Sequence, residues 1–265
     1  MKVLLTGATG YIGKRLLAVL LRQNHEVICC VRDKERFPKT GLYKDKRIQV
    51  LEIDFLKVDE SFQLPKNLDA AFYLIHSMSA STSDFEALEA ESAQNFVQLI
   101  NKTNCQQIIY LGGIVNEVKL SKHLESRKQV ETVLRSSTVP VTALKAGIIV
   151  GSGCASFEIM RDLVEKLPMM ITPKWLNTKC QPIAIRNVLQ FLSGVVGKEW
   201  SYGQSYDIGG PDILTYKQML LQFGHVRGLK RLIMIVPVMT PKLSSYWLYF
   251  VTATSYKLAV NLVDS

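Results

Sequence analysis

Three glycines near the amino terminus have a spacing that suits phosphate binding. Gly7, Gly10 and Gly13 form a G-x-x-G-x-x-G motif. Between a strand and a helix, the first glycine permits a tight turn, the second lets the backbone approach a pyrophosphate, and the third lets the helix pack closely on the strand. The helix N-terminus then offers N–H groups and a positive dipole end to the phosphates. A turn that binds nothing is the alternative, but the context favours a dinucleotide-binding loop of Thr6, Gly7, Thr9, Gly10, Tyr11, Ile12 and Gly13.

The residues after the second expected strand bear on the choice of dinucleotide. An acidic residue there would bond the ribose 2′-hydroxyl of NAD, whereas an arginine accommodates the 2′-phosphate of NADP. No acid closes Glu26–Val31, and Arg32 comes first after it. Its planar guanidinium can meet a phosphate with two parallel hydrogen bonds. We therefore expect NADP(H) to be preferred, while Asp33 keeps NAD(H) possible, because it could serve the 2′-hydroxyl or pair with a neighbouring lysine.

Further cofactor contacts are expected after the third and fourth strands. Asp54, beside Phe55, is placed to meet an adenine amino group, or else it is a surface residue that caps the next turn. Ile75, His76 and Ser77 stand at the carboxyl end of the fourth strand, where ligands of doubly wound sheets collect. His76 would face the ribose or the nicotinamide, or it would be a structural, hydrogen-bonded histidine.

These residues need a framework of alternating strands and helices, and the first 150 residues predict one. Short continuous apolar runs separated by amphipathic stretches are typical of a parallel sheet with helices on both faces. Right-handed crossovers make such a sheet doubly wound, so the expected fold class is α/β with a Rossmann sheet. The expected strands are Lys2–Thr6, Glu26–Val31, Ile48–Ile53, Ala70–Ile75, Gln107–Leu111 and Val141–Ala146, and the expected helices are Tyr11–Gln23, 84–102 and Ser121–Arg135.

After residue 150 the alternation loosens. Residues 151–265 predict a smaller, mixed α/β lobe on the substrate side, packed on a dinucleotide-binding core of residues 1–150. An aromatic run, Tyr246–Val251, falls on a helix expected after Pro241. It would pack within the protein, line an apolar pocket, dock a further domain or lie at a membrane interface. The other expected elements are Phe157–Leu167, Pro182–Ile185, Val188–Gly197, Ser205–Ile208, Tyr216–Phe223 and Leu232–Val236.

Together these features resemble the short-chain dehydrogenase/reductase superfamily, in particular its extended and atypical branches. The resemblance runs from the glycine motif to Tyr206–Pro211. Three runs, Tyr73–Met78, Ala146–Gly151 and Ile171–Trp175, are similar to an atypical subgroup of bacterial NAD(P)-binding proteins with unassigned substrates. The resemblance implies an NAD(P)H-dependent oxidoreductase. Members of the subgroup are often longer, so a C-terminal domain missing from this chain is also expected.

The catalytic residues that the superfamily implies are not matched. The superfamily uses a Tyr and a Lys four residues apart on the helix after the fifth strand, with a Ser near the end of that strand. Here His123 stands at the Tyr position, Arg127 at the Lys position, and Gly112-Gly113 at the Ser position. An imidazolium can donate a proton near neutral pH, although a cation at Arg127 would favour the neutral ring. His123 is a catalytic candidate, a ligand contact or a surface histidine, and Arg127 could also hold the ribose or a cofactor phosphate.

Composition excludes several other classes. The 265 residues carry a formal charge of +9, but the basic residues are interleaved with acids and form no stripe, so nucleic acid is not an expected partner. Five cysteines without a C-x-x-C pair predict neither a disulfide framework nor a zinc site, and we expect no metal. This cysteine usage favours a reducing cytoplasm. No apolar run reaches the roughly 18 residues of a membrane span, although peripheral membrane contact stays possible.

Two functions stay open on the sequence alone. The first is an NAD(P)H-dependent oxidoreductase of the atypical type, acting on a small, largely apolar molecule. The second is a non-catalytic NAD(P)-binding sensor or assembly protein. Both require the glycine motif, and the absent Tyr/Lys/Ser set favours the second. A homodimer is also possible, because helices beside such sheets often pair in the superfamily.

Overall fold

The computed structural model describes residues 1–59, 61–76, 85–114 and 122–236, without the side chains of residues 85 and 122–124. Contacts divide the chain into two compact units, each described by itself below. Unit 1 comprises residues 1–146 and 186–208, and unit 2 comprises residues 147–185 and 209 onward. The predicted C-terminal lobe of 151–265 therefore contributes one segment, 186–208, to unit 1.

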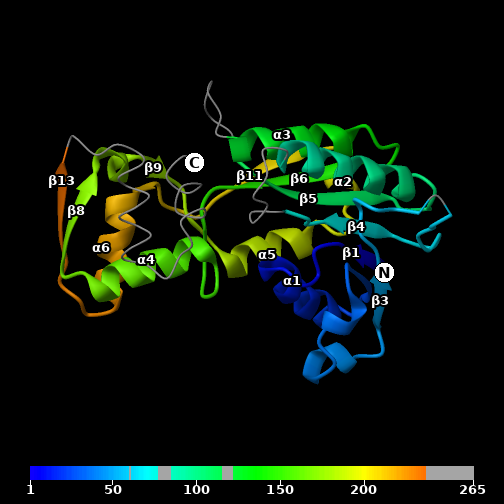
Figure 1. The fold of residues 1–265 in the computed structure, drawn as a ribbon, viewed down its shortest axis with the longest axis horizontal. Coiled ribbons are helices and arrows are strands. Elements are labelled where there is room, and N and C mark those ends of the chain that lie inside the picture. The colour runs from blue at the N-terminus through cyan, green and yellow to red at the C-terminus, as the bar shows by residue number, and fades with distance from the viewer. Residues whose placement is uncertain (60, 77–84, 115–121, 237–265) are drawn as a thin grey trace. The chain divides into compact units, whose positions relative to one another are not determined.

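A seven-stranded parallel sheet forms the centre of unit 1 (Figure 1), in the order β11-β6-β5-β4-β1-β2-β3. The chain winds outward from β1 to β3, then returns to the other side of β1 and winds outward again from β4. This topology confirms the predicted doubly wound Rossmann sheet. The strands are β1 (Lys2–Leu5), β2 (Glu26–Val31), β3 (Ile48–Glu52), β4 (Ala70–Tyr73), β5 (Gln107–Gly113), β6 (Val141–Ala146) and β11 (Ser205–Ile208).

Helices cover both faces of this sheet, as the apolar strands require. Helices α1 (Tyr11–Arg22) and α5 (Ile185–Gly194) lie on one face, and α2 (Phe85–Ile100) and α3 (Lys122–Arg135) lie on the other (Figure 1). Helix α1 buries four leucines at helical spacing, so one stripe of the helix faces the sheet. Short 3-10 turns complete the unit: η1 (Lys34–Arg36), η2 (Gly41–Lys44) and η4 (Glu199–Ser201).

The core under α2 and α3 combines apolar strands with aromatic side chains. Phe96 of α2 is fully buried and packs on Tyr73 of β4, with ring centroids 5.0 Å apart. Tyr110 of β5 and Leu134 of α3 belong to the same buried cluster. This packing fixes α2 and α3 on the face of the sheet that contains Tyr73 and Tyr110.

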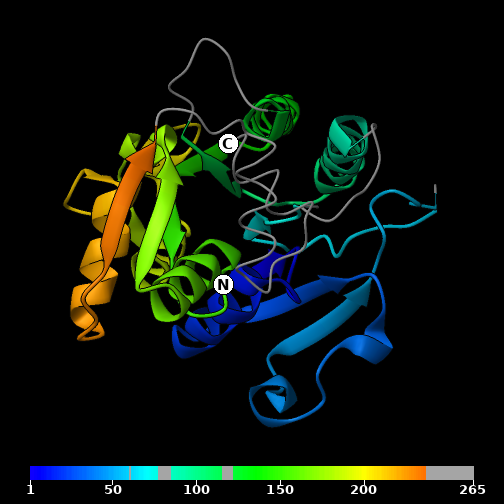
Figure 2. The ribbon, with the colours of Figure 1, turned by 60° about the vertical axis from the view of Figure 1, so that its left-hand side comes forward.

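Unit 2 has a separate apolar core. Strands β8 (Met169–Pro173) and β13 (Leu232–Val236) pair in parallel beside α4 (Ala155–Lys166) and α6 (Tyr216–Val226), as Figure 2 shows. The buried side chains of this core are Ile159, Leu163, Val164, Met170, Leu176, Leu220 and Ile233. The remaining elements are β7 (Ile149–Val150) with β10 (Ile183–Ala184), β9 (Lys179–Cys180) with β12 (Leu214–Thr215), and η3 (Lys174–Asn177).

Most expected elements are present, with small changes at their ends. Strand β5 continues through Gly112-Gly113, and β8 was not predicted. The aromatic run at Tyr246–Val251 and the helix expected after Pro241 lie outside the described residues. In the described part of the chain, no helix has the length and apolarity needed to cross a membrane.

Candidate functional site

The glycine motif lies where the winding of the sheet reverses. Strand β1 pairs with both β2 and β4, so the turn after β1 opens at the topological switch point. Ligands of open α/β sheets bind in the crevice outside the carboxyl ends of the strands at this point. The loop after β1 and the residues after β4 therefore meet at the expected place for a dinucleotide.

The loop geometry requires glycine at two of the three motif positions. Gly7 has a φ of +64°, and a Cβ there would stand 2.6 Å from the carbonyl oxygen of Leu74. A Cβ at Gly13 would collide with the carbonyl oxygen of Gly7, so the start of α1 packs directly on the turn. Thr6 fixes the loop to β4: its Oγ1 donates to the carbonyl of Phe72 and accepts from the N–H of Leu74, both at 3.0 Å.

The first turn of α1 is left open toward an anion. Gly10 occupies the N-cap, so no side chain caps the helix, and the first turn contains no acidic residue. The Arg15 guanidinium stacks over the Tyr11 ring, 4.0 Å from its centroid, and donates to the Tyr11 carbonyl at 3.2 Å. Arg15 was missed from the sequence, although its position four residues after Tyr11 on one helix is a signal of this pairing. Helix α1 thus carries a cation beside its first residue, Tyr11.

At the end of β2, Asp33 and Arg32 play different roles. Asp33 caps η1 by accepting from the Glu35 N–H at 2.8 Å, and it pairs with Arg36 at 3.2 Å. Its pairing partner is thus an arginine and not the lysine that was considered. Arg32 is exposed and has no ion-pair partner in the described part of the chain. The Asp33 carboxylate is therefore already bonded within its own turn, whereas the Arg32 guanidinium is available to bind a ligand.

Asp54 and Phe55 follow β3 as expected. Asp54 Oδ1 accepts from the N–H of Leu56 at 3.1 Å, so this carboxylate does cap the next turn. Phe55 is buried, and its carbonyl accepts from Asn95 Nδ2 of α2 at 2.7 Å. The predicted adenine contact of Asp54 stays a prediction.

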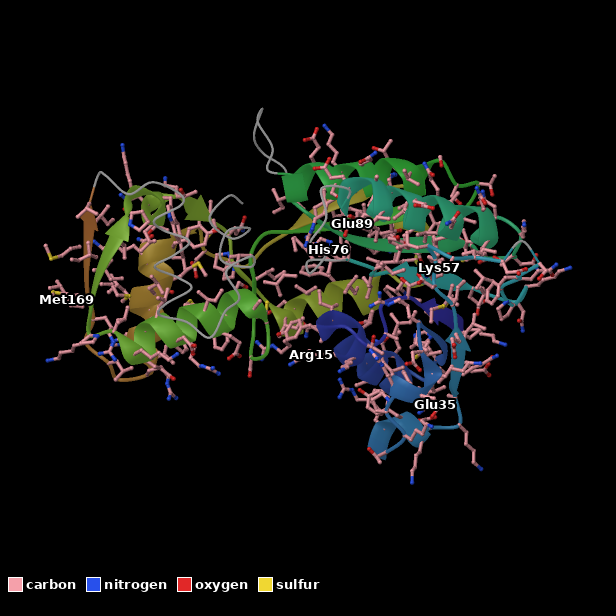
Figure 3. All side chains as sticks on the ribbon, in the orientation of Figure 1. Arg15, Glu35, Lys57, His76, Glu89 and Met169 are labelled. Carbon is pink, nitrogen blue, oxygen red and sulfur yellow. The ribbon has the colours of Figure 1, made fainter. Side chains whose placement is uncertain are left out.

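His76 belongs to a buried polar network that the sequence did not reveal. Its Nδ1 lies 2.8 Å from Oε1 of Glu89 on α2, and the Ser126 hydroxyl of α3 donates to Glu89 Oε2 at 2.5 Å (Figure 3 labels His76 and Glu89). Glu89 is 5% exposed and Ser126 fully buried, whereas the His76 side chain is 23% exposed. A buried carboxylate fixes the orientation of an imidazole and stabilises its protonated form. Ile75 is half-buried beside it, and Ser77 lies outside the described residues.

Helix α3 carries the two catalytic candidates. His123 lies in its first turn, and its side chain is outside the described residues. Arg127 is half-buried one turn later, and its carbonyl accepts from the Tyr110 hydroxyl at 3.1 Å. Burial raises the pKa of Tyr110 far above its usual range, so this hydroxyl stays protonated and holds α3 on β5. Arg127 also lines a cavity with Gly112 and Gly113. The residues that stand at the Lys and Ser positions of the superfamily pattern therefore lie around one cavity.

The arrangement has no described metal centre. Within the ranges that the structure covers, no group of three His, Cys, Asp or Glu residues is placed to hold a metal ion. The site instead offers a glycine turn, an open helix N-terminus and cations near it. These are the features of a protein that binds a dinucleotide by its phosphates.

Fold and loop together define a Rossmann-type dinucleotide-binding protein. Residues 7–162 match the family model described as NAD(P)H-binding, which spans more than half of the chain. The chain belongs to this NAD(P)H-binding family, and the predicted resemblance to atypical short-chain dehydrogenases/reductases is confirmed.

A curated relative and several solved structures are similar to this chain. The divinyl chlorophyllide a 8-vinyl-reductase of Arabidopsis thaliana is 21% identical over 224 residues, 79% of this chain and 53% of the relative. The chain thus spans about half the length of the curated relative it matches. A nucleoside-diphosphate-sugar epimerase from Staphylococcus aureus has a TM-score of 0.74 at 15% identity, covering 99% of this chain and 88% of that one. A UDP-glucuronic acid 4-epimerase from Bacillus cereus, solved with NAD, has a TM-score of 0.71 at 16% identity, and the match covers 98% of this chain and 94% of that one. At these identities the solved structures show the shared fold.

Proposed function

We propose that this protein is an NADP(H)-dependent oxidoreductase of the atypical short-chain type. The observation that carries the proposal is the turn after β1, where Gly7 and Gly13 leave no room for a Cβ and α1 opens without a side-chain cap. Such a turn receives a pyrophosphate on backbone N–H groups. The nicotinamide then supplies hydride transfer, and the chain's own residues orient the cofactor. The name of the plant relative, a reductase, supports this class of reaction.

Cofactor preference follows from the end of β2. Arg32 is exposed and available to a 2′-phosphate, whereas the neighbouring Asp33 carboxylate is already held by the Glu35 N–H and Arg36. We expect wild type to bind NADPH more tightly than NADH in fluorescence titrations. Arg32→Ala should weaken NADPH binding by roughly tenfold, since a charge-assisted hydrogen bond contributes about 1.5–3 kcal/mol. NADH binding should change little.

Gly13→Ala provides the second arm of this titration. Its Cβ would meet the Gly7 carbonyl, so α1 must shift and both cofactors should bind more weakly. If NADH is the tighter ligand for wild type and for Arg32→Ala, the NADP(H) preference is wrong. Unchanged binding in Gly13→Ala would contradict the proposed pyrophosphate site itself.

Proton delivery in the reduction is assigned to a histidine. His76 follows β4 at the ligand-binding edge of the sheet, and its Nδ1 lies 2.8 Å from Glu89 Oε1. An ionised Glu89 accepts from Nδ1, and Nε2 is the atom that we propose exchanges a proton. Ser126 in turn holds the second oxygen of Glu89. His123 is the other histidine proposed for this role, on the first turn of α3. A positioned general acid contributes about 10²–10⁴-fold to rate.

Turnover of a panel of quinones, enals and ketones with NADPH tests this assignment. His76→Gln should lower kcat by at least 10²-fold if His76 is the donor. Glu89→Gln, which keeps the shape of the side chain, should shift the pH profile of kcat and lower it less. Loss in His123→Gln instead would assign the donor to α3. Tight NADPH binding without any turnover favours the alternative, a non-catalytic NAD(P)-binding sensor or assembly protein.

A further inference from the structure

A small basic cavity opens beside the carboxyl ends of β5 and β6. It is about 190 Å³ in volume, and its lining residues are Gly112, Gly113, Arg127, Lys128, Glu131 and Lys145. The two glycines end β5 and contribute backbone only, while Lys145 comes from β6 and the other three residues come from successive turns of α3. All of these elements belong to unit 1.

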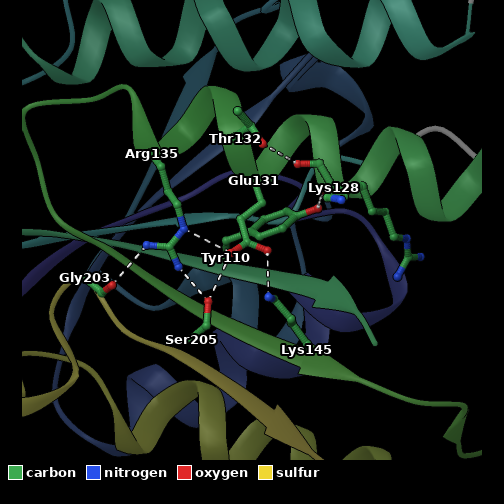
Figure 4. A network of polar contacts seen from close by, with 9 residues as sticks. Tyr110, Lys128, Glu131, Thr132, Arg135, Lys145, Gly203 and Ser205 are labelled. Carbon is green, nitrogen blue, oxygen red and sulfur yellow. Dashed lines mark hydrogen bonds and ion pairs between the residues drawn. The ribbon is translucent and has the colours of Figure 1, made fainter. Parts of the chain in front are cut away.

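Glu131, the one acid among the described lining residues, is already neutralised. Glu131 pairs with Arg135 at 3.0 Å and with Lys145 at 3.4 Å, and it accepts from the Ser205 hydroxyl at 3.1 Å (Figure 4). Arg135 is itself held by the Gly203 carbonyl and the Ser205 hydroxyl. Glu131 therefore serves as a tie between α3, β6 and β11, and its charge is matched by two cations.

Two cations of the cavity remain, Arg127 and Lys128. Neither Arg127 nor Lys128 has an ion-pair partner among the residues that the structure describes. The backbone of Arg127 is nevertheless fixed, because its carbonyl accepts from the buried Tyr110 hydroxyl at 3.1 Å. The Arg127 guanidinium, next to the backbone of Gly112 and Gly113 in the cavity lining, can donate two parallel hydrogen bonds to one carboxylate or phosphate. The described lining of the cavity thus carries a net positive charge, and the backbone that presents Arg127 is held in position.

The size of the cavity limits what it can hold. Pockets that enclose a drug-sized ligand measure about 300–1,000 Å³. A volume of about 190 Å³ therefore accommodates one end group of a ligand and not a whole dinucleotide. Its position at the carboxyl ends of β5 and β6, away from the glycine turn between β1 and β4, separates it from the pyrophosphate site by a full strand of the sheet.

We infer that this cavity is a subsite for the anionic end of the substrate, a carboxylate or phosphate held by Arg127 and Lys128. The inference rests on the proposed oxidoreductase function and refines it. The largely apolar substrate expected from the sequence becomes an amphipathic one, with an acidic group docked beside β5 and β6. Arg127, at the Lys position of the superfamily pattern, serves the substrate acid in this assignment.

Binding of two simple probes to the full chain tests the subsite. We expect malonate and inorganic phosphate to shift the amide NMR signals of Gly112 and Gly113 in a saturable manner. Arg127→Gln/Lys128→Gln should weaken this binding at least tenfold, and Lys128→Gln alone, at an exposed side chain, should weaken it by a smaller factor. The tighter of the two probes identifies the substrate acid as a carboxylate or as a phosphate.

The matched control removes one arginine and one lysine charge near the amino ends of the strands, at the end of the sheet opposite the cavity. Arg22 ends α1 and Lys102 follows α2, both exposed and both just before a strand begins. Arg22→Gln/Lys102→Gln should bind the probes as wild type does. Equal weakening in this control would mean that only net charge matters, and unsaturable shifts in wild type would mean that the cavity is no site; either result overturns the inference.

A repeat of the titration with saturating NADPH separates a substrate subsite from a cofactor contact. Simultaneous binding of NADPH and the probe supports the subsite, whereas competitive displacement would assign the cavity to a phosphate of the cofactor and overturn it. Failure of wild type to bind NADPH at all would contradict the proposed function, and it is recorded independently of the probe shifts. The two failures are therefore distinguishable.

Discussion

At the scale of single residues, burial decides how the cysteines titrate. Burial raises the pKa of Cys29 to about 12 and that of Cys105 to about 11, and all five cysteines are free thiols. An unfolded thiol ionises near pH 8.5, so above that pH the unfolded chain releases protons that the folded chain retains. The free energy of unfolding should therefore fall as pH rises from about 8.5 toward 11. Each buried thiol contributes about 1–2 kcal/mol of this loss between pH 8 and pH 10.

Urea denaturation of wild type and Cys29→Ala at both pH values checks the sign and the size. The variant should be less stable than wild type at pH 8 and should lose less stability on going to pH 10. Cys154→Ala, at a half-buried thiol, is the matched comparison. A stability loss of the same size in wild type and Cys29→Ala would contradict the role of the buried thiol.

At the scale of elements, local patterns were sufficient for most of unit 1. Strands β2 and β6 were predicted with their observed ends, because their largely apolar sequences are buried on both faces of the sheet. Helix α1 was located by the glycine turn before it and by an apolar face of Ile12, Leu16, Val19 and Leu20, of which the two leucines are buried. Strand β8 was missed because it alternates exposed and buried residues over only five positions, and its partner β13 lies some 60 residues away in the sequence.

The contacts between elements were not accessible to the same reasoning. Glu89 and Ser126 meet across 37 residues of sequence, and each occupies one position on a helix whose periodicity reports only its apolar face. The cavity beside β5 likewise requires Lys145 of β6 to approach Glu131 of α3. The glycine turn was predictable because its chemistry is encoded in consecutive residues. The histidine network and the basic cavity depend on the packing of α2 and α3.

At the scale of the whole molecule, cofactor binding should stabilise unit 1 more than unit 2. The glycine turn, Arg32 and His76 all belong to unit 1, and unit 2 has its own core around Met170 and Ile233. A ligand at 100 times its Kd stabilises the folded state that binds it by about 2.7 kcal/mol. We therefore expect saturating NADPH to slow amide hydrogen exchange about a hundredfold in β1, β4 and β5, for those amides that exchange through unfolding of unit 1.

Peptides from β8, β13 and α4 should change less than twofold in the same experiment, because their core has no described member in unit 1. Gly13→Ala is the control, since a displaced α1 should abolish the NADPH effect in unit 1 while leaving unit 2 as in wild type. Equal slowing in both units would mean that the two cores unfold as one cooperative body. The hydrogen-exchange pattern thus measures the coupling between the units directly, and it does so without knowledge of the substrate.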